Sequence, residues 1–218
     1  MNKPLTAVIA MLLATGAAPV RGAELQVLVK DQHGKLVCDA VVSAIPADPK
    51  NALHAKPPQD AVDQVDKQFV PYVKVIYVGS KVRFPNKDNI RHQVYSFSPA
   101  KKFELPLYAG STAPPVLFET PGVVVLGCNI HDWMVGFIYV SSTPFFAKTE
   151  SAGTAGISDM PPGEYEVRIW QPGMERSEES TARKVTMSAG TPTRIEWQLA
   201  VKATYRVPRV SGPGAAGY

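Results

Sequence analysis

The stretch Gly127-Cys128-Asn129-Ile130-His131-Asp132-Trp133-Met134 decides the fold of this 218-residue chain. It places a thiol, an imidazole and a thioether on one short loop, in the spacing Cys-x2-His-x2-Met. The apolar run 123–126 precedes this loop and a second apolar run, 135–140, follows it. Short apolar runs on either side of a turn are typical of buried strands. The sequence therefore predicts a ligand loop between two strands of a β-sheet.

A second histidine would complete a metal site with these side chains. We identify it as His92, which lies 36 residues before Cys128. One Cys, two His and a weakly binding Met form the donor set that selects copper for electron transfer. Zinc sites favour Cys, His and carboxylate ligands, so Met134 argues against zinc. The predicted metal ligands are His92, Cys128, His131 and Met134.

At these residues the segment from about Gln68 to Val140 resembles a cupredoxin, the small copper β-barrel of plastocyanin and amicyanin. The spacing of the ligand loop is similar to the short amicyanin version. The run Phe118-Glu119-Thr120-Pro121-Gly122 resembles the family's F-x-x-P-G turn before the Cys strand. The wider pattern is also similar to that of periplasmic proteins labelled methylamine utilisation proteins, a label that establishes no role in methylamine metabolism.

The approach to the first ligand is similar too, with one departure. Phe84, Asn86 and Asp88 precede His92 as in that family. The residue after the first His is usually Asn there and helps to tie the two ligand loops together, whereas this chain has Gln93.

The resemblance implies a type 1 copper site that cycles between Cu(I) and Cu(II). Cys128 would bind as thiolate, His92 and His131 would complete a plane with it, and Met134 would be the long axial ligand. In the family the downstream His lies nearer the surface, so electrons would leave through His131. Trp133 beside it is either part of an apolar docking rim or a packed core residue.

The flanks of this segment resemble a different module, the transthyretin-like sandwich called a carboxypeptidase regulatory-like domain. Residues 24–45 are predicted to form a hairpin around the turn 31–35, similar to the family's D-x-x-G-K pattern. The run Asp159-Met160-Pro161-Pro162-Gly163-Glu164-Tyr165 resembles its D-x-P-P-G-x-Y stretch. The predicted fold class is all-β, a Greek-key cupredoxin barrel plus a second small β-sandwich.

The order of these pieces along the chain predicts an insertion. We expect a signal peptide at 1–22, the first sandwich strands at 23–47, and the cupredoxin domain with its N-terminal linker at 48–142. The remaining sandwich strands follow at 143–200 and a disordered tail at 201–218. A guest domain can sit in a loop of its host when its termini lie close together at the surface.

The N-terminal segment determines the expected compartment. A charged start at Lys3 and an apolar run at 5–18 are typical of a secretory signal peptide, which predicts a periplasmic protein. An uncleaved membrane anchor is the alternative. In an oxidising compartment the two cysteines, Cys38 and Cys128, could instead form a disulfide. We interpret Cys38 as a small buried residue, because free Cys is among the most buried residue types.

Charge and composition narrow the function. Without Lys3 and Arg21, 21 basic residues face 19 acidic ones, which gives no basic patch that would indicate nucleic-acid binding. The chain has four His and no His-x-His pair, so we do not expect an enzyme such as a multicopper oxidase. We expect a monomeric carrier of single electrons between redox partners, such as a periplasmic cytochrome or dehydrogenase. The alternative is a non-redox copper-binding or structural β-sandwich protein with a degenerate site.

Overall fold

The computed structural model describes residues 22–52, 57–110 and 113–202. Strands dominate this part of the chain, and its helical segments are two short 3-10 helices, Pro49–Asn51 and Glu178–Thr181. No helix in these ranges is long and apolar enough to cross a membrane. The all-β prediction is confirmed. The predicted signal peptide up to residue 21 and the predicted tail from residue 203 lie outside the described residues.

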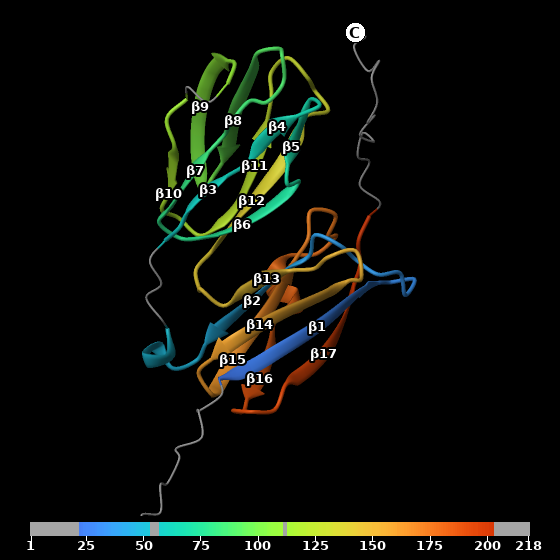
Figure 1. Ribbon diagram of the computed structural model, residues 1–218. Helices are drawn as coiled ribbons and strands as arrows, with labels where there is room; N and C mark the ends of the chain where they lie inside the picture. The colour runs from blue at the N-terminus through green and yellow to red at the C-terminus, as the bar shows by residue number, and fades with distance from the viewer. Residues whose placement is uncertain (1–21, 53–56, 111–112, 203–218) are drawn as a thin grey trace, which may run out of the picture.

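The strands form two β-sandwiches, one above the other in Figure 1. The upper sandwich contains β3 (Gln59–Ala61), β4 (Asp63–Val65), β5 (Gln68–Val70), β6 (Val73–Tyr77), β7 (Ser80–Arg83), β8 (His92–Ser98), β9 (Lys101–Tyr108), β10 (Val116–Phe118), β11 (Gly122–Gly127) and β12 (Val135–Ser141). The lower sandwich contains β1 (Ala23–Asp31), β2 (Val41–Pro46), β13 (Phe146–Lys148), β14 (Thr154–Met160), β15 (Gly163–Trp170), β16 (Arg183–Met187) and β17 (Thr193–Leu199).

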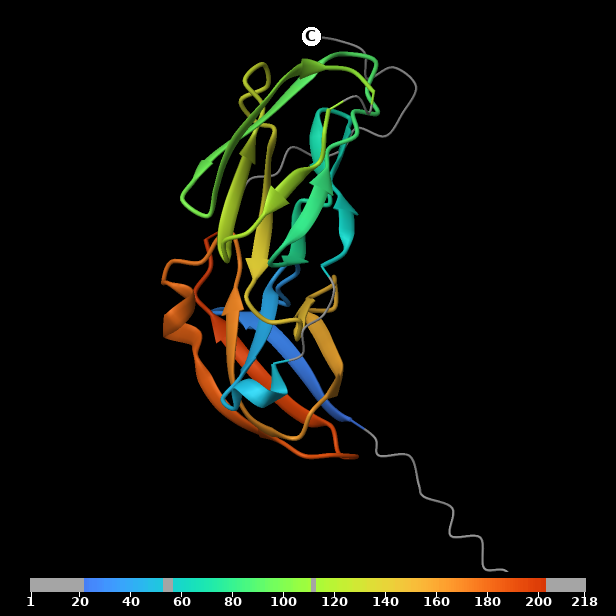
Figure 2. The same cartoon turned by 90° about the vertical axis from the view of Figure 1, so that its left-hand side faces the viewer.

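The largest sheet of the upper sandwich positions the ligand loop. Its strand order is β6-β12-β11-β8-β9, and it faces the smaller sheet β10-β7-β3 across the core, as the side view in Figure 2 shows. The side chains of Val124, Leu126 and Ile138 are fully buried between the sheets. Gly127 lies opposite Tyr95 in the antiparallel pair β11–β8. Cys128 therefore leaves β11 at the end of the sheet where β8 begins with His92.

The edge strand β9 is irregular. Pro106 interrupts it, and proline cannot donate a hydrogen bond to a neighbouring strand, so it is confined to edges and irregularities. The register of the β8–β9 pair shifts between His92 and Val94. Such bulges locally twist a strand and redirect its side chains, and they are common beside functional sites.

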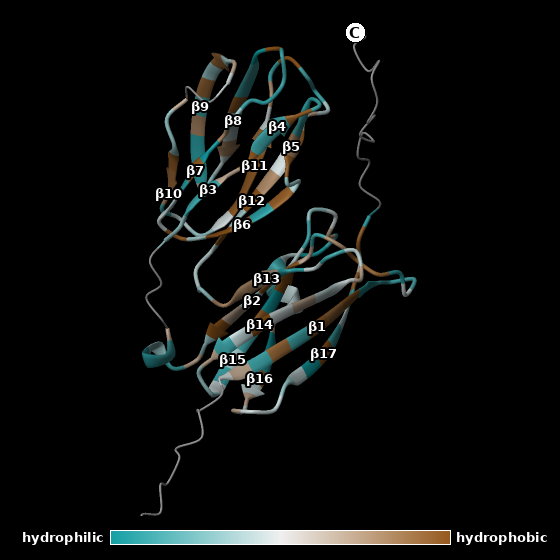
Figure 3. Ribbon diagram, viewed as in Figure 1, coloured by the Kyte–Doolittle hydropathy of each residue, from teal (hydrophilic) through white to brown (hydrophobic). Residues whose placement is uncertain are grey.

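The lower sandwich is built from both flanks of the chain. β1 pairs with β14 and β17, and β2 pairs with β13 and β15. The alternation of apolar and polar residues along β1 is visible in Figure 3, and Leu25, Val27 and Val29 point into the core. Trp197 and Tyr165 are the largest side chains buried there. Every named strand that borders β1 or β2 thus comes from residues 146–199.

The predicted hairpin of residues 24–45 is only partly correct. The turn forms, with Asp31 accepting hydrogen bonds from the backbone N–H groups of His33 and Lys35. The two strands then separate into opposite sheets, and a single bridge between Lys30 and Leu36 remains of their pairing. Alternation predicts which face of each strand is buried, but it does not determine which strands pair.

The prediction that Cys38 is buried is wrong. The residue precedes β2, which begins at Val41, and its side chain is exposed. Val37 and Ala40 supply the buried apolar surface of this segment instead. Both cysteines are free, so the alternative of a Cys38–Cys128 disulfide is not realised.

The two sandwiches contact each other through an aromatic cluster. Val41 of the lower sandwich is buried with Val73 and Tyr139 of the upper one. The Trp170 ring lies 5.7 Å from the Tyr139 ring and 5.8 Å from the Phe137 ring. Ring pairs at this separation stabilise a contact beyond the area they bury. This contact lies at the opposite end of β12 from the ligand loop.

Candidate metal centre

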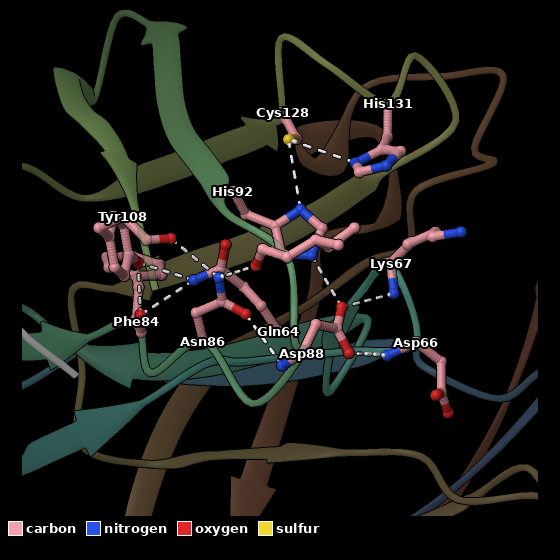
Figure 4. Close-up of polar contacts among 11 residues, drawn as sticks. Gln64, Asp66, Lys67, Phe84, Asn86, Asp88, His92, Tyr108, Cys128 and His131 are labelled. Atoms are coloured by element: carbon pink, nitrogen blue, oxygen red, sulfur yellow. Dashed lines mark hydrogen bonds and ion pairs between the residues drawn. The ribbon is translucent and has the colours of Figure 1, made fainter. Parts of the chain in front are cut away.

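Three of the predicted ligands meet at one point. The Sγ of Cys128 lies 3.8 Å from Nδ1 of His92 and 3.9 Å from Nδ1 of His131. One donor atom from each of these residues lies within 4.8 Å of the other two. Figure 4 shows both imidazole rings turned toward the sulfur atom. Residues 36 apart in sequence therefore offer a thiol and two ring nitrogens to one point.

The backbone around the site explains this convergence. His92 is the first residue of β8, and its side chain shares the buried face of that strand with Val94 and Ser96 because alternate residues of a strand point to the same side. Beyond Cys128 the chain turns tightly, because the N–H of Met134 donates to the carbonyl of His131 at 2.9 Å. That turn returns the chain to the sheet as β12.

The fourth predicted ligand, Met134, is also buried. Its side chain is 1% exposed and belongs to the same apolar cluster as Cys128, Leu126 and Ile138. The thioether is thus held within the core of the upper sandwich.

His92 is fixed from behind by a carboxylate. Its Nε2 lies 2.7 Å from Oδ2 of Asp88. An ionised carboxylate can only accept, so Nε2 carries the proton and Nδ1, the atom facing Cys128, keeps its lone pair. His92 has no solvent-exposed surface. Its ring is therefore held in the orientation and tautomer that a metal requires.

Asp88 is itself held by the turn between β4 and β5. Its two carboxylate oxygens accept the backbone N–H groups of Asp66 at 2.7 Å and Lys67 at 2.9 Å. Both turn residues have positive φ, 53° and 57°. Positive φ at both central residues defines the type I′ turn that joins hairpin strands tightly. Neighbouring backbone donors thus hold the acidic group against the histidine.

The pKa values of the thiol and of this imidazole move in opposite directions. Burial acts to raise the pKa of Cys128, but His92 and the backbone N–H groups of Ile130 and Gln93 outweigh it, so the pKa is lowered. Burial acts to lower the pKa of His92, but Cys128 and Asp88 outweigh it, so that pKa is raised. The protein thus favours the thiolate, which is the form that binds soft metals.

The loop before His92 has a hydrogen-bonded support of its own. Asn86 is buried and donates to the carbonyls of Ile90 at 2.8 Å and Tyr108 at 2.9 Å, while its Oδ1 accepts the N–H of Asp88. Gln64 donates to the Tyr108 hydroxyl at 2.7 Å. Tyr108 is the partner of His92 in the sheet. This network connects the loop to the strand that carries the first ligand.

His131 has a different setting. Its ring is tilted against the His92 ring, with centroids 4.9 Å apart, and against the Trp133 ring, with centroids 5.3 Å apart. Burial and the nearby charges of His92 and Lys67 lower its pKa. Trp133 is 49% exposed, and its neighbour Ile130 is 50% exposed. The core-packing interpretation of Trp133 is therefore wrong, and the indole lies at the surface beside His131.

The sequence predicts four ligands, and the structure brings the donor atoms of three of them to one point and buries Met134 in the same core. The sequence did not reveal Asp88 as the partner of His92, nor Asp66 and Lys67 as the donors that fix Asp88. Their only sequence signal is a run of turn-forming residues, which does not reveal contacts 22 residues apart. The side chain of Gln93 turns away from the site to Glu104, while its backbone N–H serves Cys128.

No protein-family model matches the chain, and no curated protein matches its sequence. Among solved structures, a copper-containing nitrite reductase from Thermus scotoductus SA-01 is 28% identical over 45% of this chain, with a TM-score of 0.37. The match spans 27% of that enzyme's chain, well under two thirds of its length.

Small copper proteins are matched over their full length. A purple cupredoxin from Nitrosopumilus maritimus is 24% identical over 38% of this chain and 100% of its own, with a TM-score of 0.34. A reduced Cu(I) form of an amicyanin mutant is 19% identical over 47% of this chain and 99% of its own, with a TM-score of 0.35. All these likenesses leave more than half of this chain unmatched, so what the site can do follows from its own side chains.

The donor set fits copper better than other metals. A thiol, two imidazoles and a nearby buried thioether are soft or borderline donors, which calcium and magnesium avoid. A structural zinc site would have four N, S or carboxylate ligands, and among the described residues the only His/Cys/Asp/Glu group suited to a metal has three members. The residues present therefore suit Cu(I) and Cu(II).

Proposed function

We propose that the protein is a type 1 copper protein that carries single electrons between redox partners in the periplasm. The observation that carries this proposal is the position of the buried Cys128 thiol within 3.9 Å of Nδ1 of both His92 and His131. His92, Cys128, His131 and Met134 would hold the copper, which supplies one-electron exchange between Cu(I) and Cu(II) when bound. The resemblance of the segment from about Gln68 to Val140 to cupredoxins supports the same conclusion.

The surroundings of the site favour electron transfer over substrate turnover. The side chains of Cys128, His92 and Met134 are 3%, 0% and 1% exposed. Hydrogen bonds from Asn86 hold the loop before His92, and the backbone N–H groups of Asp66 and Lys67 hold Asp88 behind its ring. Little reorganisation would therefore accompany a change of charge on the metal. A dry and rigid pocket is what an electron carrier needs, whereas a catalytic metal must keep a position open for substrate.

The surface beside His131 suits a transient contact with another redox protein. Ile130, Trp133 and Val135 are 50%, 49% and 37% exposed and follow one another around the ligand loop. Exposed apolar side chains gathered in one place mark interaction sites on soluble proteins. A periplasmic cytochrome or dehydrogenase that docked here would place its own redox group close to His131.

The lower sandwich would serve as an accessory domain of the carboxypeptidase regulatory-like kind. Its strands come from both sides of the upper sandwich in sequence, which supports the proposed insertion. A cleaved signal peptide at residues 1–22 would deliver the protein to the periplasm, where we propose that it acts as a monomer.

The test is optical and kinetic. The protein loaded with Cu(II) should show the intense blue band of a copper–thiolate bond and should lose it when a reduced periplasmic cytochrome is mixed with it in a stopped-flow instrument. The Zn(II)-loaded protein is the control and should leave the cytochrome reduced. A colourless Cu(II) complex would favour the non-redox alternative. A blue form that no physiological reductant bleaches would contradict the carrier function.

A further inference from the structure

We propose that Asp88 is a positioning residue that lowers the reduction potential of the copper by holding His92 through a charged hydrogen bond. The inference rests on the proposed function, because it concerns the metal that His92 would bind. It adds a residue that belongs to no ligand position, and its basis is the chain of contacts drawn in Figure 4 from Cys128 through His92 and Asp88 to the turn at Asp66 and Lys67.

The hydrogen bond to Asp88 orients the His92 ring. Asp88 Oδ2 lies 2.7 Å from His92 Nε2, and the side chain of Asp88 is only 13% exposed. Water therefore competes weakly for the carboxylate, and hydrogen bonds to ionised groups are about twice as strong as neutral ones. Because Nε2 carries the proton, Nδ1 is the nitrogen available to a metal. A carboxylate behind a histidine ligand fixes its tautomer and makes the other ring nitrogen a better donor.

The carboxylate of Asp88 is itself held rigidly. The N–H groups of Asp66 and Lys67 bind its two oxygens from a turn whose backbone is constrained by positive φ at both residues. Asn86 accepts the N–H of Asp88 itself at 3.0 Å. The acidic group is thus held from the turn and from its own loop, so it stays against His92 in both oxidation states.

The negative charge of Asp88 would act differently on the two oxidation states of the copper. A nearby negative charge stabilises the more positive metal ion more strongly, and this preference is larger in a buried site than in water. A more basic imidazole likewise binds Cu(II) in preference to Cu(I). Asp88 should therefore favour the oxidised form and lower the potential.

A purely architectural role is the competing explanation, because Asp88 also links the β4–β5 turn to the site. Two substitutions separate the roles. Asp88→Asn keeps an oxygen that can accept from His92 but removes the charge. Asp88→Ala removes both. Asp63→Asn is the matched control, since Asp63 is an acidic residue in the same hairpin that pairs with Nζ of Lys87 at 2.6 Å rather than with a predicted ligand.

The potential is measured on the copper-loaded full chain. We expect Asp88→Asn to remain blue and to lose Cu(II) affinity by about 10- to 100-fold. With a smaller loss for Cu(I), the ratio of the two affinities should change about tenfold, which raises the one-electron potential by about 59 mV. Asp63→Asn should leave the ratio unchanged. An Asp88→Asn protein with the wild-type potential would overturn the inference, and so would an equal rise in Asp63→Asn.

A second measurement uses the metal-free protein, so that poor copper loading cannot obscure the result. Long-range proton–nitrogen NMR correlations of the ring should show His92 protonated at Nε2 in the wild type and in Asp88→Asn, and a mixture of tautomers in Asp88→Ala. A wild-type ring protonated at Nδ1 alone would overturn the inference. If the wild type shows this tautomer but never forms a blue copper complex, the proposed function fails while the positioning of His92 stands.

Discussion

The two histidines at the site belong to regions of different construction. His92 begins a strand, is fully buried, and is held by Asp88, which two backbone N–H groups hold in turn. His131 lies on a loop between strands and is 9% exposed, and apart from Cys128 its ring packs against the other histidine and the half-exposed Trp133. One ligand is anchored to the fold and the other is placed at the edge of the molecule.

This difference assigns separate tasks to the two regions. In the proposed copper site, the anchored side would determine the geometry and electronic character, since the hydrogen bond to Asp88 holds its ring. The loop side would bring a metal-bound ring close to the surface, where the proposed partner could approach. A site with two histidines as deeply buried as His92 would be rigid but isolated, and one with two loop histidines would be accessible but poorly ordered.

The largest expected effect comes from the ligand that both regions share. Cys128→Ser should abolish the blue colour and most copper affinity, because a hydroxyl is neither soft nor acidic enough to replace a thiolate. Visible absorption and a copper titration measure both losses. Cys38→Ser is the control. Cys38 is exposed, so we expect full colour and a free energy of unfolding changed by no more than about 0.5 kcal/mol. A blue Cys128→Ser protein would remove the thiolate from the site.

The next prediction compares the histidines directly. His131→Gly should regain the blue band when millimolar imidazole is added, because free imidazole can enter from the surface beside Trp133. His92→Gly should regain little, because its position has no exposed surface and the incoming ring must also reach Asp88. Titration of both variants with imidazole, followed by visible absorption, measures the difference. Equal recovery in the two variants would contradict the distinction between an anchored and an accessible ligand.

A smaller effect is expected at the axial position. Met134→Leu should keep the blue colour and raise the potential, because a weak donor that favours Cu(II) is lost. The two side chains have similar volume, so the core should lose less than about 1.5 kcal/mol of stability. Voltammetry of wild type and variant measures the change, and thermal unfolding of the metal-free proteins controls for packing. A lower potential in the variant would exclude Met134 as the axial ligand.

The smallest expected effect lies at the far end of β12, where the two sandwiches meet. Burial is the largest cause that raises the pKa of Glu178, whose carboxylate accepts from the Tyr139 hydroxyl. The folded state therefore favours the protonated acid. Its contribution to stability is complete below the unfolded pKa, near the ordinary value of 4.5, and is lost as the pH rises through the higher folded value.

Glu178→Gln should remove that pH dependence, because the amide stays neutral and its oxygen can still accept from Tyr139. Thermal unfolding of the metal-free variant from pH 4 to 8 should thus show a flatter profile than wild type, with the variant more stable at pH 7. Glu119→Gln is the control, since Glu119 is exposed and its charge is not among the causes that shift the pKa of Glu178. A steeper profile in Glu178→Gln would show that the carboxylate stabilises the contact in its charged form.

The sequence allowed the strand positions and the ligand residues to be predicted for different reasons. Alternation placed His92, Val94 and Ser96 on one face of a strand, and that face is buried. The spacing of Cys128, His131 and Met134 on one loop was sufficient to place them near one another. Strand pairing was harder to predict, and the hairpin of residues 24–45 was only partly correct because its two strands bury their apolar faces from opposite sheets.

By itself the sequence determined the all-β class and predicted which side chains a metal would meet, since both depend on local patterns: a period of two along strands and a short spacing on a loop. Only the tertiary structure decided what holds those side chains. The contact from Asp66 and Lys67 to Asp88 crosses from a hairpin turn to the loop before β8, and Trp170 meets Tyr139 across two sandwiches. Contacts between distant segments follow from how sheets pack, and no local pattern of residues encodes them.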